Sequence, residues 1–135
     1  MGHYEVKSKR EKVKNMENKG GDIKRRVYVF ALNVINFVDT LKKDAVTIVI
    51  INQLIRSSTS IGANIIEAQA GSSKKDFINF YHHALKSANE TKFWIGIMRD
   101  SKRCDKKKAS TLLDEVNQIA KILGAILVKM KFKKS

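Results

Sequence analysis

The sequence predicts an all-α protein: an antiparallel up-down-up-down four-helix bundle that assembles into an oligomer. Three observations predict this fold. The 135 residues include no proline, the residue that most strongly breaks helices. Apolar residues recur at alternating steps of three and four, which places them on one face of a helix. Four such segments are separated by connections of only a few residues, and short connections make neighbouring helices antiparallel.

The first predicted helix covers residues 22–43 and follows a charged stretch. Residues 1–20 mix both signs of charge and contain few large apolar side chains, so we expect a basic flexible tail. Asp22 follows two glycines and is a candidate N-cap, while Lys42 and Lys43 favour the C-terminal helix dipole. The apolar positions that predict the buried face are Ile23, Val27, Phe30, Val34, Phe37 and Leu41.

The second predicted helix runs from an N-cap at Asp44 to residue 70. Gly71 is expected to end it in the left-handed conformation that glycine tolerates. Residues 45–51 are apolar on every side of this helix. A helix of this kind is normally covered all round, whereas a single four-helix unit covers only one face. The segment therefore predicts a subunit interface.

The third and fourth predicted helices cover residues 74–102 and 106–131. Ser73 and Asp76 match a capping box with Asp in place of Glu, which makes Ser73 the predicted N-cap. The buried face of the third helix is predicted to hold Phe77, Tyr81, Ala84, Ala88, Thr91, Ile95 and Met98. That of the fourth is predicted to hold Ala109, Leu112, Val116, Ile119, Leu123, Ile126 and Met130. The bundle thus spans residues 21–131, and residues 132–135 form a second basic tail.

The chain is strongly basic, and the excess charge lies toward its two ends. It has 27 Lys and Arg against 13 Asp and Glu, a net charge of +14. The up-down topology brings these cations to both ends of the bundle and leaves its waist nearly neutral. Such a field attracts polyanions, above all nucleic acid; alternatively, it serves only solubility. The predicted nucleic-acid-binding residues are Lys24, Arg25, Arg26, Lys42, Lys43, Lys74, Lys75, Arg99, Lys102, Arg103, Lys106, Lys107, Lys108, Lys129 and Lys131.

Short hydrogen-bonding side chains form a stripe along one face of the second predicted helix. At about 100° per residue the stripe contains Gln53, Arg56, Ser57, Ser60, Asn64 and Glu67. The opposite, dry face is predicted to contain Ile48, Ile51, Ile55, Gly62 and Ile66.

Two interpretations of this stripe remain open. We favour a buried polar network that sets the packing of helices or subunits, because an unpaired buried polar group is costly. In it the serine hydroxyls bond backbone carbonyls, and Arg56 is a candidate partner for Glu90 of the third helix. The alternative is a surface that meets a ligand, although Glu67 would repel phosphate. The predicted assembly residues are Arg56, Ser60, Asn64, Glu67 and Glu90.

The sequence indicates no enzyme, no metal and no cofactor. Glu67 and Glu90 lack the histidine three residues on that a di-iron bundle requires, and adjacent His82 and His83 point in different directions. Cys104 lies among basic residues that are expected to lower the pKa of its thiol, but an incidental turn cysteine is the simpler interpretation. A single cysteine and the lack of a bilayer-length apolar run favour a cytoplasmic location without membrane contact.

Residues 53–95 carry a distinctive combination of an arginine, small residues, Ser-Ile, Asn-Ile and a glutamate, followed by a serine turn and an aromatic-rich helix. This combination resembles the four-helix-bundle family of 23S rRNA intervening-sequence proteins over residues 22–130. The sequence departs from the family pattern at Ala68 and Lys86, where that pattern has glycine. The matching positions are Arg56, Ser60, Ile61, Asn64, Ile65, Glu67, Ser73, Phe77, Phe80, Ala84, Ser87 and Glu90.

The resemblance implies a bundle without enzyme activity that assembles as a homopentamer around a central channel. It extends to the accessory protein of diversity-generating retroelements, a basic bundle that binds nucleic acid and a reverse transcriptase. We therefore expect a non-enzymatic oligomer that binds RNA, or alternatively DNA, through its basic ends with low sequence specificity. The alternative functions are a protein-binding scaffold, such as a subunit accessory to a reverse transcriptase, and a stable bundle whose charge serves only solubility.

Overall fold

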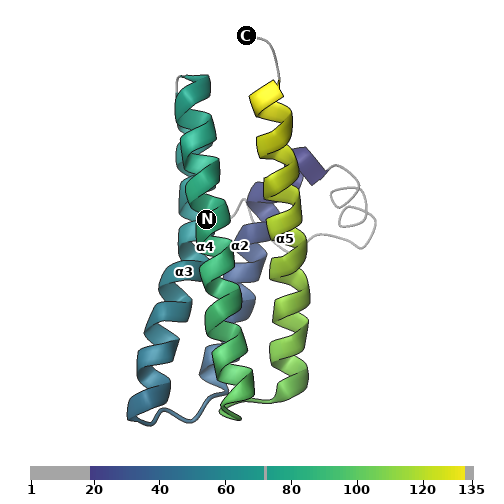
Figure 1. Ribbon diagram of the computed structural model, residues 1–135. Helices are drawn as coiled ribbons and strands as arrows, with labels where there is room; N and C mark the ends of the chain where they lie inside the picture. Colours follow the sequence, from purple (N-terminus) through teal and green to yellow (C-terminus); the bar gives the residue numbers. More distant parts are fainter. Residues whose placement is uncertain (1–18, 72, 133–135) are drawn as a thin grey trace.

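The computed structural model describes residues 19–71 and 73–132, which form four α-helices. These are α2 (Lys19–Asp39), α3 (Ala45–Ala70), α4 (Lys74–Asp100) and α5 (Lys106–Phe132). Each helix packs against the next, and α2 also packs against α5, so the four form a closed ring (Figure 1). The all-α class is confirmed, and the arrangement agrees with an up-down-up-down bundle. The predicted tails at 1–20 and 132–135 lie almost entirely outside the described residues.

The bundle has two distinct ends. The connections α2–α3 (residues 40–44) and α4–α5 (residues 101–105) lie together at the bottom of Figure 1, which we name the lower end. The α3–α4 connection and the C-terminal end of α5 lie at the top, which we name the upper end. The placement of the cations described below follows from this arrangement.

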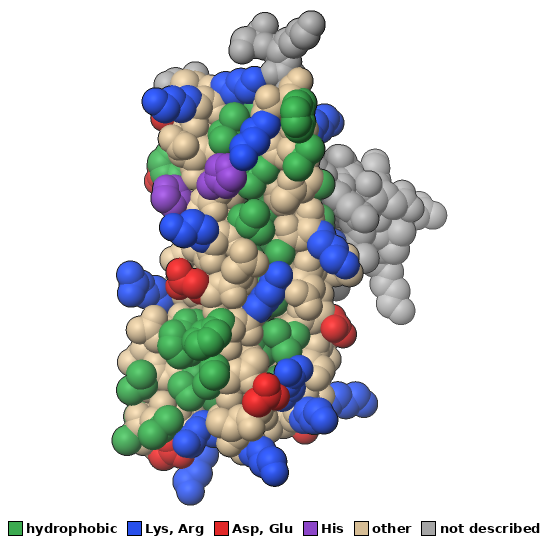
Figure 2. All heavy atoms as spheres, in the orientation of Figure 1, with side chains coloured by type: hydrophobic (Ala, Val, Ile, Leu, Met, Phe, Trp, Pro, Cys, Tyr) green, Lys and Arg blue, Asp and Glu red, His purple; other side chains and the backbone are tan. Residues whose placement is uncertain are grey.

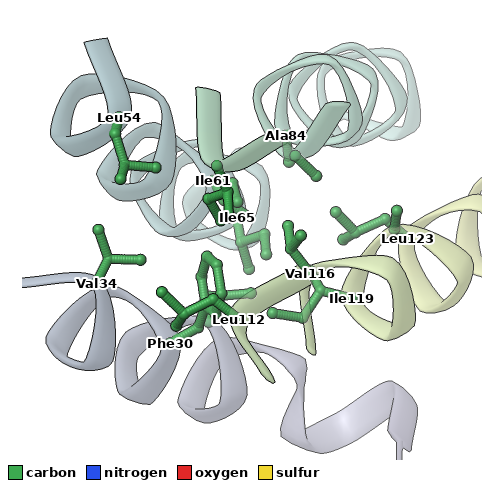
Figure 3. Close-up of a cluster of buried hydrophobic side chains, with 14 of the residues drawn as sticks. Phe30, Val34, Leu54, Ile61, Ile65, Ala84, Leu112, Val116, Ile119 and Leu123 are labelled. Carbon is green, nitrogen blue, oxygen red and sulfur yellow. The ribbon is translucent and has the colours of Figure 1, made fainter. Parts of the chain in front are cut away.

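The periodic apolar positions form the core, as predicted. All six predicted positions of α2 are buried, as are all but Phe77 in the predicted stripe of α4. In α5 the stripe is buried as far as Leu123, while Ile126 and Met130 are half-buried. Figure 3 shows how side chains from all four helices meet along the axis, among them Phe30, Ile61, Ile65, Ala84, Val116 and Leu123.

The boundaries of α2 differ from the prediction at both ends. The helix begins at Lys19, so Asp22 lies inside its first turn and is not the N-cap. It ends at Asp39, because the backbone then tightens: the N–H of Thr40 donates to Phe37 O at 3.0 Å, and that of Leu41 to Val38 O at 3.1 Å. The Lys43 ammonium donates to Val38 O and Leu41 O at 3.1 and 3.0 Å. Lys43 therefore stabilises this helix end from outside the helix.

Two of the three predicted N-caps are confirmed. Asp44 Oδ1 accepts from the N–H of Thr47 at 2.9 Å, and this hydrogen bond holds the pKa of Asp44 below its ordinary value. Ser73 Oγ accepts from the N–H of Asp76 at 3.0 Å. The prediction for Gly71 is wrong, because its φ of −68° and ψ of 152° are extended and not left-handed. Its N–H bonds Glu67 O and Ala68 O, which ends α3 without a positive φ.

The α4–α5 connection contains a residue whose backbone is in the left-handed conformation, which the sequence did not predict. Lys102 has a φ of 61°. The N–H of Lys102 donates to Arg99 O at 3.0 Å and that of Arg103 to Met98 O at 3.1 Å, the bond pattern of a Schellman motif. The residue after the helix in this motif is usually glycine. Because lysine occupies it here, the predicted helix extended to residue 102, two residues too far.

Replacing Lys102 by glycine is expected to stabilise the bundle by about 0.5–1 kcal/mol. A left-handed backbone costs a non-glycine residue about 1–2 kcal/mol, and the greater freedom of glycine in the unfolded chain offsets part of that gain. The measurement is urea unfolding of Lys102→Gly beside Lys102→Ala, which loses the same charge but keeps the positive φ. Equal stability of the two variants would contradict the assignment of strain to this residue.

Candidate nucleic-acid interface

The lower end carries a cluster of exposed lysines. Lys42 follows α2, Lys102 lies in the α4–α5 connection, and three consecutive lysines form the first turn of α5. All five side chains are exposed, and none forms an ion pair with the described residues. Figure 2 shows basic side chains around this end of the molecule. We name Lys42, Lys102, Lys106, Lys107 and Lys108 the lower lysine cluster.

The arginines predicted for the interface are bound within the protein. Two nitrogens of the Arg26 guanidinium, Nε and Nη2, donate to the Glu115 carboxylate at 2.8 Å, which joins α2 to α5. This hydrogen bonding raises the pKa of Arg26. Arg99 donates to its neighbour Asp100 at 2.8 Å, and Arg25 lies 3.6 Å from Asp22. Their charge is therefore largely neutralised locally.

Arg103 fixes the position of the lower lysine cluster. Its Nη1 lies 3.4 Å from Thr47 Oγ1 and 3.5 Å from Asp44 Oδ2, at the start of α3. Since Arg103 follows Lys102 directly, these contacts hold the α4–α5 connection against the α2–α3 connection.

The α4–α5 connection also contains Cys104, whose pKa is raised by burial and by Asp105. The expectation that nearby cations lower it is wrong, because burial outweighs them.

The upper end is basic as well. Lys24 and Lys75 are exposed, and Lys74 is half-buried. Lys129 and Lys131 are exposed in the last turns of α5. These residues come from three helices, so the upper end presents a looser set of cations than the lower lysine cluster.

The polar stripe of α3 lies mainly on the surface of the protomer. Ser57 Oγ donates to Leu54 O at 3.2 Å and Ser60 Oγ to Arg56 O at 2.7 Å, as predicted. Asn64 Nδ2 donates to Ser60 O at 2.8 Å. The side chains of Arg56 and Glu67 are exposed, as is that of Glu90 on α4. A buried network of Arg56, Asn64 and Glu67 within one protomer is therefore wrong; one between subunits stays a prediction.

The prediction of which residues form the dry, apolar face of α3 is also wrong. Of its five members only Ile51 is buried, while Ile48 and Ile66 are exposed. The core is contacted by a different apolar stripe, which includes Ile50, Leu54, Ile61, Ile65 and Ala68. One serine of the polar stripe, Ser57, also turns inward. Thr91 Oγ1 of α4 lies 2.9 Å from Ser57 Oγ and 2.8 Å from Ser87 O, and both distances are within hydrogen-bonding range.

A second surface, which the sequence pattern only partly revealed, is apolar. Val46 and Val49 of α3 are exposed, the latter to 60%. On α4, Phe93 and Ile97 are exposed and Trp94 is half-buried, with the Phe93 and Trp94 rings 4.9 Å apart. Figure 2 shows hydrophobic side chains gathered over the lower halves of α3 and α4. We name these five residues the apolar patch.

The residues that the structure describes contain no group of three or more His, Cys, Asp and Glu that could hold a metal ion. Within the same ranges no helix is long and apolar enough to cross a membrane. His82 is half-buried and His83 exposed on α4, consistent with their different directions on the helix.

Comparison with known proteins identifies the family. The chain is 32% identical to a protein of unknown function from the S23 ribosomal protein family of Bacteroides thetaiotaomicron, whose crystal structure superposes with a TM-score of 0.75. The match covers 82% of this chain and 98% of that one. A comparison with curated proteins gives no match. Residues 21–125 match the 23S rRNA-intervening sequence proteins. The helices, their order and this match together show that the chain belongs to the 23S rRNA-intervening sequence protein family.

Proposed function

We propose that the protein is a non-enzymatic, oligomeric, RNA-binding bundle of the cytoplasm, with DNA as the alternative ligand. The observation that carries the proposal is the lower lysine cluster: five exposed cations at one end, beside Arg99 and Arg103, which are paired with Asp100 and Asp44. Contacts between lysines and phosphates carry no sequence information. Binding is therefore expected to depend strongly on salt and weakly on sequence.

The apolar patch supports assembly. Exposed aromatic and branched side chains that gather on one face are unusual in a soluble monomer, and they are typical of protein contacts. Arg56 of the polar stripe and Glu90 of α4 are also exposed, and they carry opposite charges. A copy of the chain would offer each of them a partner. Assembly would also multiply the +14 charge of one chain into a surface on which several phosphates bind at once.

The experiment measures RNA affinity between low and physiological salt by fluorescence anisotropy, for the wild type and two charge-matched triple variants. One replaces Lys106, Lys107 and Lys108 by glutamine. The other replaces the waist residues Lys86, Lys92 and Lys121. The first is expected to weaken binding and to reduce the slope of log K against log salt by about 2, since each phosphate contact contributes about 0.7–0.9.

Two results would overturn this proposal. A wild-type protein that ignores RNA and DNA even at low salt would mean that the charge serves only solubility. Equal losses in the two triple variants would mean that total charge, and not the lower lysine cluster, determines binding.

A second function is favoured by the aromatic content of the apolar patch. The patch could receive a different protein, such as a reverse transcriptase of a retroelement, with the bundle as its accessory subunit. Light scattering distinguishes the two. A chain that stays monomeric at high concentration would leave the patch for another partner, whereas a stable oligomer would assign it to a second copy.

A further inference from the structure

We propose that the groove between α2 and α5 binds one unpaired nucleotide of the strand held by the lower lysine cluster. This inference rests on the proposed nucleic-acid binding and adds a site to it. The groove has a volume of about 330 Å³ and lies between the C-terminal half of α2 and the first two turns of α5. This volume is near the lower limit of the ~300–1,000 Å³ usual for small-ligand sites, which suits a single nucleotide better than a folded element of RNA.

The groove has an apolar floor and a polar rim. Phe37 and Leu112 form the floor, and both are buried. Asn33 and Asn36 lie on the α2 side, and Thr111 lies on the α5 side. A flat apolar floor with polar edges is complementary to a base, which has apolar faces and a polar edge. Phe37 is too deeply buried for its ring to stack on a base, so recognition must come from the rim.

The two asparagines supply that recognition. Neither side-chain amide has a hydrogen-bond partner among the described residues, and each offers two donors and one carbonyl acceptor. Base edges present the same mixture of donors and acceptors, and amide side chains pair with them. The rim hydroxyls differ, because Thr40 Oγ1 donates to Phe37 O at 2.6 Å and Thr111 Oγ1 to Lys107 O at 3.1 Å. Their oxygens remain as acceptors only.

The charges around the groove favour a phosphate at its mouth. Lys108 lines the groove and is exposed, and Lys106 and Lys107 precede it in the same helical turn. Four acidic residues lie within three positions of a lining residue in the chain: Asp39, Asp105, Asp114 and Glu115. Asp39 and Asp114 are exposed to solvent and offset part of the positive charge. Glu115 is bound to Arg26 by two hydrogen bonds of 2.8 Å, which neutralises it. Asp105 accepts from the N–H of Lys108 at 2.9 Å and is opposed by the three lysines that follow it.

The position of the groove is compatible with assembly. In the ring of helices the α2–α5 contact lies across from the α3–α4 contact. The apolar patch lies on α3 and α4. A second copy that pairs patch to patch leaves the groove open, so the two surfaces can then be used together.

The experiment compares two double variants that change charge equally. Asn33→Asp with Asn36→Asp keeps the size of both rim side chains, replaces their donors by acceptors and repels phosphate. Asn89→Asp with Asn117→Asp makes the same substitutions at exposed positions of α4 and α5 outside the groove. The probes are a fluorescent 12-nucleotide uridine RNA, its deoxy counterpart and a duplex of equal length. Circular dichroism checks that each variant is folded.

The groove variant is expected to bind the single-stranded RNA about tenfold or more weakly than the wild type, the scale of a lost base contact. The control is expected to lose about threefold or less, and the duplex is expected to bind both variants alike. Comparison of the RNA with the deoxy probe shows whether the sugar contributes. Equal losses in the two variants would overturn the groove while leaving the RNA-binding function intact. A wild type that binds none of the probes would instead overturn the function itself.

Discussion

Replacing Phe93 and Ile97 by glutamate is expected to abolish the proposed oligomer and leave single folded chains. Both residues are exposed on α4, Phe93 to 57%, and both belong to the apolar patch. In an assembled interface each glutamate would be buried without a partner, which costs several kcal/mol. In the separate chain both positions face water, so the helices and the core should be unaffected. Light scattering measures the mass, and circular dichroism measures the helix content.

The matched control replaces Ala125 and Val128 of α5 by glutamate. Both are exposed near the upper end, away from the apolar patch, and the change of charge is the same. This variant is expected to keep the mass of the wild type. A wild type that is already monomeric, or a Phe93/Ile97 variant that keeps the full mass, would refute assembly through the apolar patch.

The second large effect is expected in the core. Phe30 of α2 is only 1% exposed and lies among side chains of α3 and α5 (Figure 3). Its replacement by alanine removes a large apolar side chain and leaves a cavity that rigid helices fill only partly. Such substitutions typically cost about 3–5 kcal/mol. In a domain of this size, whose total stability is about 5–15 kcal/mol, the loss would move the urea midpoint strongly downward.

Leu32 provides the comparison, because it lies two residues along the chain on the outer side of α2 and is exposed. Leu32→Ala is expected to change the free energy of unfolding by about 0.5 kcal/mol or less. Similar losses in Phe30→Ala and Leu32→Ala would mean that the outer side of α2 is covered as well, which would place a further interface there.

Most of the helix boundaries follow from local chemistry, and the misses have local causes. The caps at Asp44 and Ser73 are recognisable because a side-chain acceptor precedes an apolar periodic segment. The end of α2 could not be predicted, since no glycine or proline marks Thr40. The left-handed conformation of Lys102 could not be predicted either, because the packing of the connection imposes a positive φ that lysine disfavours.

The orientation of α3 shows a different limit. This helix has two apolar stripes, one containing Leu54 and Ile61 and the other containing Ile48 and Ile66. Periodicity identifies both but does not indicate which one contacts the core. The choice depends on the side chains of α2 and α4 opposite, which a single sequence does not place. The stripe that is left outside adds to the apolar surface of the protomer.

The candidate interface was predictable in its charge and not in its pairings. Of the fifteen predicted cations, five form the lower lysine cluster, whereas Arg26 lies beside the third turn of α5, away from both ends. The partner of Arg26 is Glu115, 89 residues away in the chain, and the groove at Asn33 and Asn36 exists only once α2 and α5 lie side by side. Contacts of this kind depend on tertiary structure, so no local sequence pattern predicts them.

Arginines and lysines have different roles in this protein, so the surface charge can be changed without changing the fold. Arg26 and Arg103 tie elements of the fold together, whereas lysines such as Lys107 have no structural partner among the described residues. The lysines of the lower lysine cluster can therefore be exchanged for glutamine one at a time, giving a graded series of proteins with one fold and net charges stepping down from +14. With such a series, the affinity for a polyanion can be measured as a function of net charge while the fold of the bundle stays the same.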